Sequence, residues 1–295
     1  MMRGSSPSTL TVMLSYRHAF HAGNFADVLK HLVLVSTLHY ATRKESPLFY
    51  LDTHAGAGLY RLDSDAAQKT GEAAGGIGKL DFAQLTARAG AEGKGLLQAY
   101  HEAVSPFLVR GTYPGSPLLA MALLRRQDHL RLFELHSTDY RLLVANTEKD
   151  RRVHCAQEDG FQRLPALLPP AQKRAVVLID PSYEVKDDYA RCVQALTEIH
   201  RRMPAAQVVL WYPVVQRSNV DWMLAALQRS TVRDLWQAEL GIDADTDTHG
   251  MTACGLLLLN PPWTLAAQLR EALPLLQQQL APDTGHWFVK NLIGE

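Results

Sequence analysis

The sequence predicts an α/β fold: a doubly wound sheet, mostly parallel, that closes with a final antiparallel strand. Short Val, Leu and Ile runs alternate with helical patterns along most of the 295 residues, which is the order of strand–helix–strand units. The last two strand-like runs, residues 232–240 and 253–259, are joined by an acidic loop without a helical pattern. Because a short connection of this kind joins antiparallel neighbours, we expect the last strand to reverse direction.

The composition fits one large domain and limits the classes of partner. Lys plus Arg and Asp plus Glu are equal at 30 each, so the chain lacks an overall basic coat for nucleic acid, although a local patch stays open. The three cysteines are widely spaced, which is typical of a protein of the reducing cytoplasm. No apolar run reaches the length of a membrane span, and we expect a cytoplasmic protein without membrane contact.

The N-terminal part combines a helix with local positive charge. Residues 1–12 lack the apolar core of a secretory signal, and we expect a disordered extension before one domain over residues 13–295. Phe25–Thr42 repeats apolar residues at helical spacing, and Asn24 is suited to cap that helix. Residues 1–44 hold five Lys or Arg, one acid and four histidines. Two interpretations stay open: a flap that contacts phosphates, or a solvated helix face with a histidine-rich loop.

Glycines follow the first expected strand. This strand covers residues 48–53 and runs directly into His54-Ala55-Gly56-Ala57-Gly58. Glycines after a buried strand let the backbone pass close to a ligand, here near Gly56. The spacing matches neither the dinucleotide fingerprint nor a P-loop, so the pattern favours a nucleoside-type ligand only moderately.

The strand pattern then disappears over residues 59–111. This segment is rich in Ala, Gly, Gln and Lys, and we expect a small helical insertion that caps or flanks the site. Dense turn chemistry in Tyr113-Pro114-Gly115-Ser116-Pro117 ends it, before an apolar helix over residues 118–124.

Acids follow the next two strands. Residues 130–136 form the second strand, with Glu134 near its end, where an acid can grip a ribose by its hydroxyls. An ordinary exposed glutamate is the alternative. A helix and a third strand lead to Asp159-Gly160, where Asp159 could accept a hydrogen bond from an adenine amino group or begin a turn.

The fourth strand, residues 175–179, ends abruptly in Asp180-Pro181-Ser182-Tyr183. A carboxylate at the carboxyl end of a buried parallel strand lies where open α/β sheets bind ligands. Pro181 adds a rigid turn with a free carbonyl, and Tyr183 adds a flat stacking surface. These groups together suit a planar base that bears an exocyclic amine; a simple strand stop is the alternative. The remaining elements continue the alternation, with helices over 188–202, 219–228 and 264–280 and a strand over 207–213.

These motifs together carry a family resemblance. They are Leu14-Ser15-Tyr16-Arg17-His18-Ala19-Phe20-His21-Ala22-Gly23-Asn24, Asp27-Val28-Leu29-Lys30-His31, Asp52-Thr53-His54-Ala55-Gly56-Ala57-Gly58, Tyr113-Pro114-Gly115-Ser116-Pro117, Glu134-Leu135-His136 and Asp180-Pro181-Ser182-Tyr183. The chain resembles the RlmJ family, bacterial 23S ribosomal RNA adenine-N6 methyltransferases with the class I, Rossmann-like fold. The resemblance covers nearly everything from Met13 onward, and its N-terminal run is the most specific part.

The resemblance implies transfer of one methyl group from S-adenosylmethionine to the N6 of an adenine in 23S rRNA, without a metal ion. We expect a monomer. Asp180 is implied as the catalytic acid, with Pro181 and Tyr183 beside it, while Tyr16, His18 and Lys30 position the target. Cofactor contacts are implied for His31, His54, Ser116, Glu134, Asp159 and Gly160, with Gly56 in the glycine loop. Ser182 stands where amino-methyltransferases usually have a second proline, which is expected to loosen the turn.

A second segment, Asn260-Pro261-Pro262-Trp263, is the tidier match to the Pro-Pro motif of amino-methyltransferases. We favour Asp180 over Asn260 because Asp180 follows the strand expected beside the glycine-loop strand, whereas Asn260 follows the last strand. Three other functions stay open: a DNA adenine-N6 methyltransferase, a non-catalytic RNA-binding protein on the same fold, and a metal hydrolase that uses His18, His21 and His31. The loose histidine spacing makes the last the least favoured.

Overall fold

The computed structural model describes residues 17–185, 187–246 and 250–294. The expected disordered extension over residues 1–12, and Tyr16, lie outside these residues. The helices are η1 (His18–Phe20), α1 (Phe25–Thr42), α2 (Asp65–Thr70), α3 (Glu72–Gly75), η2 (Ile77–Lys79), α4 (Phe82–Arg88), α5 (Ala91–Leu108), α6 (Ser116–Leu123), α7 (Ser137–Thr147), α8 (Gly160–Leu167), α9 (Asp188–Arg202), α10 (Arg217–Gln228) and α11 (Leu265–Leu280). The strands are β1 (Phe49–Asp52), β2 (Leu59–Arg61), β3 (Thr112–Pro114), β4 (His129–Phe133), β5 (Val153–Ala156), β6 (Ala175–Ile179), β7 (Gln207–Val214), β8 (Leu235–Gly241), β9 (Ala253–Leu259) and β10 (His286–Ile293).

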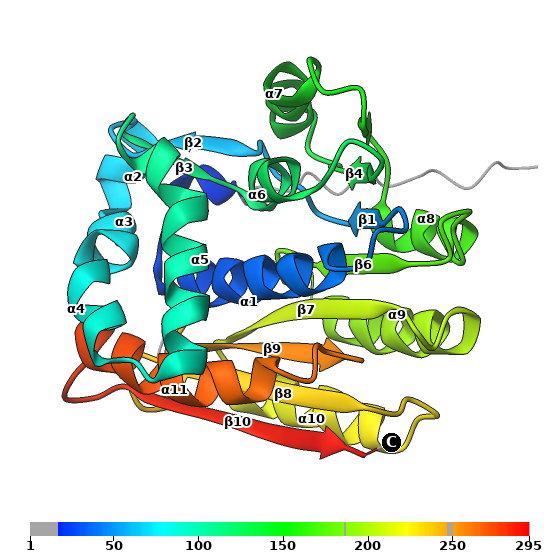
Figure 1. The fold of residues 1–295 in the computed structure, drawn as a ribbon. Coiled ribbons are helices and arrows are strands. Elements are labelled where there is room, and N and C mark those ends of the chain that lie inside the picture. The colour runs from blue at the N-terminus through cyan, green and yellow to red at the C-terminus, as the bar shows by residue number, and fades with distance from the viewer. Residues whose placement is uncertain (1–16, 186, 247–249, 295) are drawn as a thin grey trace, which may run out of the picture.

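The main sheet of the described chain has eight strands in the order β10-β8-β9-β7-β6-β1-β4-β5 (Figure 1). Strands β7, β6, β1, β4 and β5 run parallel, and β9 is antiparallel to both of its neighbours. The predicted doubly wound sheet with a reversed C-terminal strand is therefore confirmed. Strand β10, which pairs antiparallel with β8, was not expected. Its apolar residues are interrupted by Lys290 and Asn291, as suits an edge strand that is buried only in part.

Helices cover both faces of the sheet (Figure 1). Alternate residues of β6 enter two separate cores, Val176 and Leu178 on one face and Val177 and Ile179 on the other. Helices α1, α5, α6 and α11 contribute to the first core, and α8, α9 and α10 contribute to the second. This arrangement explains why β6 is apolar at every position: a central parallel strand has no face toward water.

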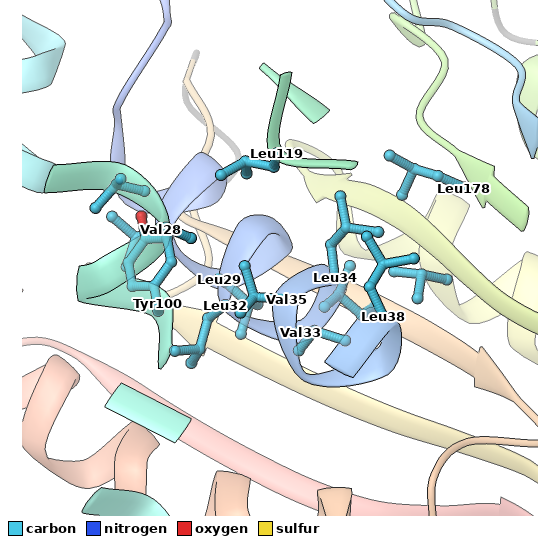
Figure 2. Close-up of a cluster of buried hydrophobic side chains, with 14 of the residues drawn as sticks. Val28, Leu29, Leu32, Val33, Leu34, Val35, Leu38, Tyr100, Leu119 and Leu178 are labelled. Carbon is cyan, nitrogen blue, oxygen red and sulfur yellow. The ribbon is translucent and has the colours of Figure 1, made fainter. Parts of the chain in front are cut away.

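Helix α1 begins after Asn24, whose side-chain oxygen accepts hydrogen bonds from the backbone N–H groups of Ala26 and Asp27, so the predicted cap is confirmed. The interpretation as a solvated helix face was wrong, since nearly the whole helix is buried, whereas the phosphate-contacting flap stays a prediction. Figure 2 shows its apolar side chains pointing to all sides, toward Tyr100, Leu119 and Leu178. A helix that is apolar all round belongs to a protein interior.

The segment predicted as a helical insertion, residues 59–111, contains α2, α3, η2, α4 and α5. It begins with strand β2, which was not expected, and strand β3, also not expected, follows it directly. Strands β2 and β3 pair antiparallel at its two ends and form a separate two-stranded sheet. Their three residues each are too few to leave a periodic pattern in the sequence. Helix α5 packs against α1 and α11, which ties the segment to the first core; its status as an insertion in one domain stays a prediction.

Candidate active site

One cavity opens at the carboxyl ends of β1, β4, β5 and β6, the edge at which the sequence placed its candidate residues. All seven cofactor contacts expected from the sequence line it: His31, His54, Gly56, Ser116, Glu134, Asp159 and Gly160. Asp180, Pro181, His18 and Lys30 line it as well. Acidic side chains outnumber Lys and Arg among the lining residues, so the cavity favours a cationic ligand.

Two glycines bring the backbone close to this cavity. Gly56 has a φ of +61°, and a Cβ on it would lie 2.3 Å from the hydroxyl of Tyr60. A Cβ on Gly160 would lie 2.2 Å from the carbonyl oxygen of Thr53. A larger residue at Gly160 would therefore have to move the backbone after β1, and one at Gly56 would adopt a strained φ and displace the Tyr60 side chain.

Glu134 follows β4 and is held in a fixed orientation. One carboxylate oxygen accepts from the Gly56 N–H at 2.8 Å, and the other accepts from the His136 N–H at 2.7 Å. Burial raises the pKa of Glu134 to about 7, although these two hydrogen bonds act in the opposite direction. A buried, oriented carboxylate with remaining lone pairs is suited to accept from a pair of ribose hydroxyls.

Asp52 does not line the cavity but holds Ser116, which does, and it was absent from the sequence-based set. Its carboxylate accepts hydrogen bonds from Ser116 at 2.6 Å and from the Tyr50 hydroxyl at 3.0 Å. Burial raises the pKa of Asp52 to about 6. Its position as the last residue of β1, directly before the glycine loop, is the signal that could have found it.

Of the two interpretations of Asp159, the structure shows it as a residue that begins a turn of the backbone. One of its oxygens accepts from the N–H groups of Phe161 and Gln162 and caps helix α8. The other oxygen pairs with Arg191, whose guanidinium also lies over the Phe161 ring. Arg191 comes from α9, and no local pattern in the sequence pointed to it.

Two histidines of the cavity are neutral because they are buried. Burial lowers the pKa of His31 to about 3 and that of His54 to about 4. Nδ1 of His54 is paired with the Thr53 hydroxyl at 2.8 Å. His31 differs, because its Nε2 is buried and has no hydrogen-bond partner among the described residues.

A chain of charged groups links helix α1 to Asp180. The ammonium group of Lys30 lies 2.7 Å from a carboxylate oxygen of Asp180 and 2.7 Å from one of Asp27. Asp27 in turn contacts Nε2 of His18 at 2.9 Å. Burial alone would lower the pKa of Lys30, but the two carboxylates outweigh it and hold this pKa well above its usual range. Lys30 is therefore a permanent cation beside Asp180.

The turn after β6 is held from both sides. Tyr183 has a φ of 54°, which is unusual for a residue other than glycine. Its hydroxyl donates to the carbonyl oxygen of Trp211 at 2.7 Å, and the Asp188 carboxylate accepts from its backbone N–H. These contacts hold Tyr183 in place, and the expected loosening of the turn by Ser182 stays a prediction.

Asp180 lies where two hollows meet. A second, more apolar groove adjoins the cavity, and Tyr183, Tyr189 and Trp211 line it. Tyr183 lines only this groove, whereas Pro181 lines only the cavity. The residues that line both hollows are His18, Lys30, Asp180, Ser182 and Glu184. A group in the groove can therefore meet a group in the cavity at Asp180.

Asn260 lies elsewhere. Strand β9 runs antiparallel to β7, so its last residue, Leu259, pairs with Val208 at the start of β7. Asn260 is consequently at the opposite edge of the sheet, where its side chain donates to the carbonyl oxygen of Ala205. The choice of Asp180 over Asn260 by position agrees with this geometry.

The three histidines of the alternative metal site do not gather around one position. His18 contacts Asp27, His21 contacts Glu72, and His31 contacts the Tyr113 hydroxyl. Throughout the described residues, no group of three or more His, Cys, Asp or Glu side chains has the arrangement of a metal site. Within the same residues no helix has the length and apolar character needed to cross a membrane.

A family model described as ribosomal RNA large subunit methyltransferase D, RlmJ, matches residues 45–293. The chain belongs to the RlmJ family. It is 44% identical over 288 residues to ribosomal RNA large subunit methyltransferase J of Escherichia coli K12, covering 96% of this chain and all of that protein. The protein of the same name from Haemophilus influenzae Rd is 44% identical over 287 residues, covering 94% of this chain and 98% of that protein.

A solved structure agrees with the fold. The Legionella pneumophila protein LPL1258 is 33% identical and superposes with a TM-score of 0.82 over 92% of this chain and 98% of that chain. The resemblance seen in the sequence motifs is thus confirmed at the level of the family and the fold. The roles of the individual site residues stay predictions, which the geometry above makes specific.

Proposed function

We propose that this protein transfers a methyl group from S-adenosylmethionine to the N6 of an adenine in 23S ribosomal RNA. The observation that carries the proposal is the position of Asp180, at the junction of an acidic cavity and an apolar, aromatic groove. The relatives that match nearly the whole chain are named as ribosomal RNA large subunit methyltransferases, which supports this class of substrate.

The cavity fits S-adenosylmethionine on three grounds. Its acidic lining suits the positive sulfonium group, the Glu134 carboxylate is oriented for ribose hydroxyls, and the unpartnered Nε2 of His31 offers one further hydrogen bond. His54, Gly56, Ser116, Asp159 and Gly160 complete the proposed set of contacts. When bound, S-adenosylmethionine supplies an electrophilic methyl group.

The residues of the chain then have to make adenine N6 a nucleophile. The lone pair of this exocyclic amine is delocalised into the ring, which makes it a weak nucleophile. Asp180 and the carbonyl oxygen of Pro181 accept hydrogen bonds from its two protons, favour a pyramidal nitrogen and stabilise the positive charge that develops on it. One of these protons leaves through the Asp180 carboxylate after transfer. Neither a metal ion nor a covalent enzyme intermediate is required.

Lys30 has a positioning role in this proposal. It holds one oxygen of Asp180 at 2.7 Å and leaves the other oxygen for the substrate amine. Tyr183 stacks the adenine in the groove after the base has left any helix, and His18 and Tyr16 help to hold the target nucleotide. The enzyme acts as a cytoplasmic monomer.

The test uses purified protein, labelled S-adenosylmethionine and protein-free 23S rRNA from cells that lack this activity, followed by nucleoside analysis. We expect N6-methyladenosine as the labelled product. Transfer to DNA in place of rRNA would contradict the proposed partner. Binding of S-adenosylhomocysteine without transfer to any nucleic acid would favour the non-catalytic RNA-binding alternative. Metal analysis and light scattering of the same preparation test the metal-free monomer.

A further inference from the structure

A buried chain of hydroxyl groups ends on the ring of His31. The Tyr100 hydroxyl, from helix α5, lies 3.0 Å from the Tyr113 hydroxyl, which lies 2.9 Å from Nδ1 of His31. The Tyr113 ring also stacks on the imidazole, with a centroid separation of 5.4 Å. All three side chains are almost fully buried. Each proton in this chain therefore needs a defined acceptor.

The hydrogen bonds that join these three side chains can run in one of two directions. If Tyr100 donates to Tyr113 and Tyr113 donates to Nδ1, both hydroxyl protons have acceptors. In the reverse direction, Nδ1–H donates to Tyr113 and Tyr113 donates to Tyr100, whose own proton is left without an acceptor among the described residues. In the first direction the unpaired donor is Nε2–H, which also has no partner among the described residues. His31 lines the cavity, where a ligand can accept from Nε2–H, whereas Tyr100 does not line it, so the first direction is preferred. Nδ1 then carries no proton, and a neutral ring carries its proton on Nε2.

The surroundings of Nε2 favour the same tautomer. A carboxylate oxygen of Asp27 lies 3.9 Å from Nε2, too far for a hydrogen bond but close enough to attract an N–H dipole. Burial lowers the pKa of His31 to about 3, so the ring is neutral and only one nitrogen is protonated at physiological pH.

We propose that Tyr113, backed by Tyr100, is a positioning residue that fixes His31 in the Nε2–H tautomer, so that His31 donates to the carboxylate of the methionyl part of S-adenosylmethionine. This inference rests on the proposed function. It assigns Tyr113 of β3 a task in binding the methyl donor, although Tyr100 and Tyr113 are absent from the cavity lining.

The order of the strands indicates where the methionyl end of S-adenosylmethionine lies in the cavity. Asp159 follows β5, Glu134 follows β4 and Asp180 follows β6, with β1 between the last two. With the ribose at Glu134 and the reacting methyl group at Asp180, the adenine of the donor extends toward β5. The methionyl end then lies on the β1 and β6 side, where His31 follows Lys30 on α1. An N–H donor there suits a carboxylate acceptor.

The tautomer itself is observable by NMR. Protein labelled with ¹⁵N in its histidines, with His31→Gln used to assign the signal, reports which ring nitrogen carries the proton. We expect a protonated Nε2 and a bare Nδ1. In Tyr113→Phe this preference is weakened, because only the attraction of Asp27 remains. Tyr100→Phe retains it, because the Tyr113 proton still has Nδ1 as its acceptor. A protonated Nδ1 in the unaltered protein would overturn the proposal.

Calorimetry with two ligands tests the consequence. S-adenosylhomocysteine carries the methionyl-type carboxylate, and 5′-methylthioadenosine keeps the adenosine but lacks the amino-acid part. We expect Tyr113→Phe to weaken S-adenosylhomocysteine by roughly 10-fold and to leave 5′-methylthioadenosine nearly unchanged. Tyr212→Phe, which removes another fully buried hydroxyl and does not affect a residue of the cavity lining, should change neither affinity.

The outcomes separate the two proposals. Equal losses for both ligands in Tyr113→Phe mean a general structural effect and overturn the tautomer inference. Failure of the unaltered protein to bind S-adenosylhomocysteine at all would contradict the proposed function itself.

Discussion

The ionisation of Glu134 should make the affinity for the methyl donor depend on pH. Because burial raises its pKa to about 7, the free protein carries a mixture of ionised and protonated Glu134 at neutral pH. Only the ionised form has both oxygens available as acceptors for ribose hydroxyls in addition to the two backbone N–H groups. The affinity for S-adenosylhomocysteine should therefore rise with pH and level off above pH 8.

The expected size of the effect follows from this pKa. At pH 6 about one-tenth of the molecules have an ionised Glu134, so the affinity should be roughly 10-fold below its plateau. Calorimetric titrations between pH 5.5 and 8.5 measure this slope. Glu134→Gln should bind weakly and show a flat profile between pH 6 and 8, since it removes the titrating group. A flat profile in the unaltered protein, or the same slope in Glu134→Gln, would refute the reasoning.

Glu134→Gln, which should weaken binding, should also make the folded protein more stable. A carboxyl whose folded pKa of about 7 exceeds its ordinary value of 4.5 binds its proton more tightly in the folded state. Its ionisation therefore destabilises the fold as the pH rises from about 4.5 to 7, by about 3 kcal/mol in total. Since glutamine loses one of the two backbone hydrogen bonds, worth about 1 kcal/mol, Glu134→Gln should be about 2 kcal/mol more stable at pH 8. The gain should be absent at pH 4, which denaturant titrations at both values can check.

Three further substitutions test separate parts of the account. Gly160→Ala puts a Cβ 2.2 Å from the Thr53 carbonyl oxygen and should weaken S-adenosylhomocysteine by more than roughly 10-fold in calorimetry, whereas unchanged affinity would mean that this close approach is unimportant. Lys30→Met leaves Asp27 and Asp180 without their shared cation and should lower the free energy of unfolding by roughly 3–5 kcal/mol and reduce transfer; a variant as stable as the parent would contradict the buried ion chain. Asn24→Ala removes the cap of α1 and a hydrogen bond to Glu72, and thermal unfolding should show a loss of about 1–2 kcal/mol.

The location of the site could be predicted from the strand that each motif follows. The motif at Asp180 alone could have been a strand stop, and the motif at Asn260 looked better. The order of the strands and the reversed direction of β9 place them at opposite edges, and both features could be inferred from the alternation of strands and helices. The sequence predicted Glu134 and Gly56 as lining residues for the same reason, since each lies in a loop that follows a parallel strand.

The remaining features depend on contacts between distant parts of the chain. The charge of Lys30 suggested a solvated surface, but Asp27 and Asp180 neutralise it inside the protein, and Asp180 lies 150 positions away. Arg191 reaches Asp159 from another helix, and Tyr100 reaches His31 through Tyr113. No local periodicity encodes such pairs. Strand β10 was missed because an edge strand needs only half of its surface to be apolar.

The central claim is that Asp180 activates the adenine amine and has no part in holding the donor. The most direct measurement compares Asp180→Ala with Asn260→Ala in two assays, methyl transfer to 23S rRNA and calorimetric binding of S-adenosylhomocysteine. We expect Asp180→Ala to abolish transfer and to keep the affinity nearly intact, and Asn260→Ala to behave as the parent protein in both assays. Normal transfer by Asp180→Ala, or loss of transfer in Asn260→Ala at unchanged stability, would contradict the account.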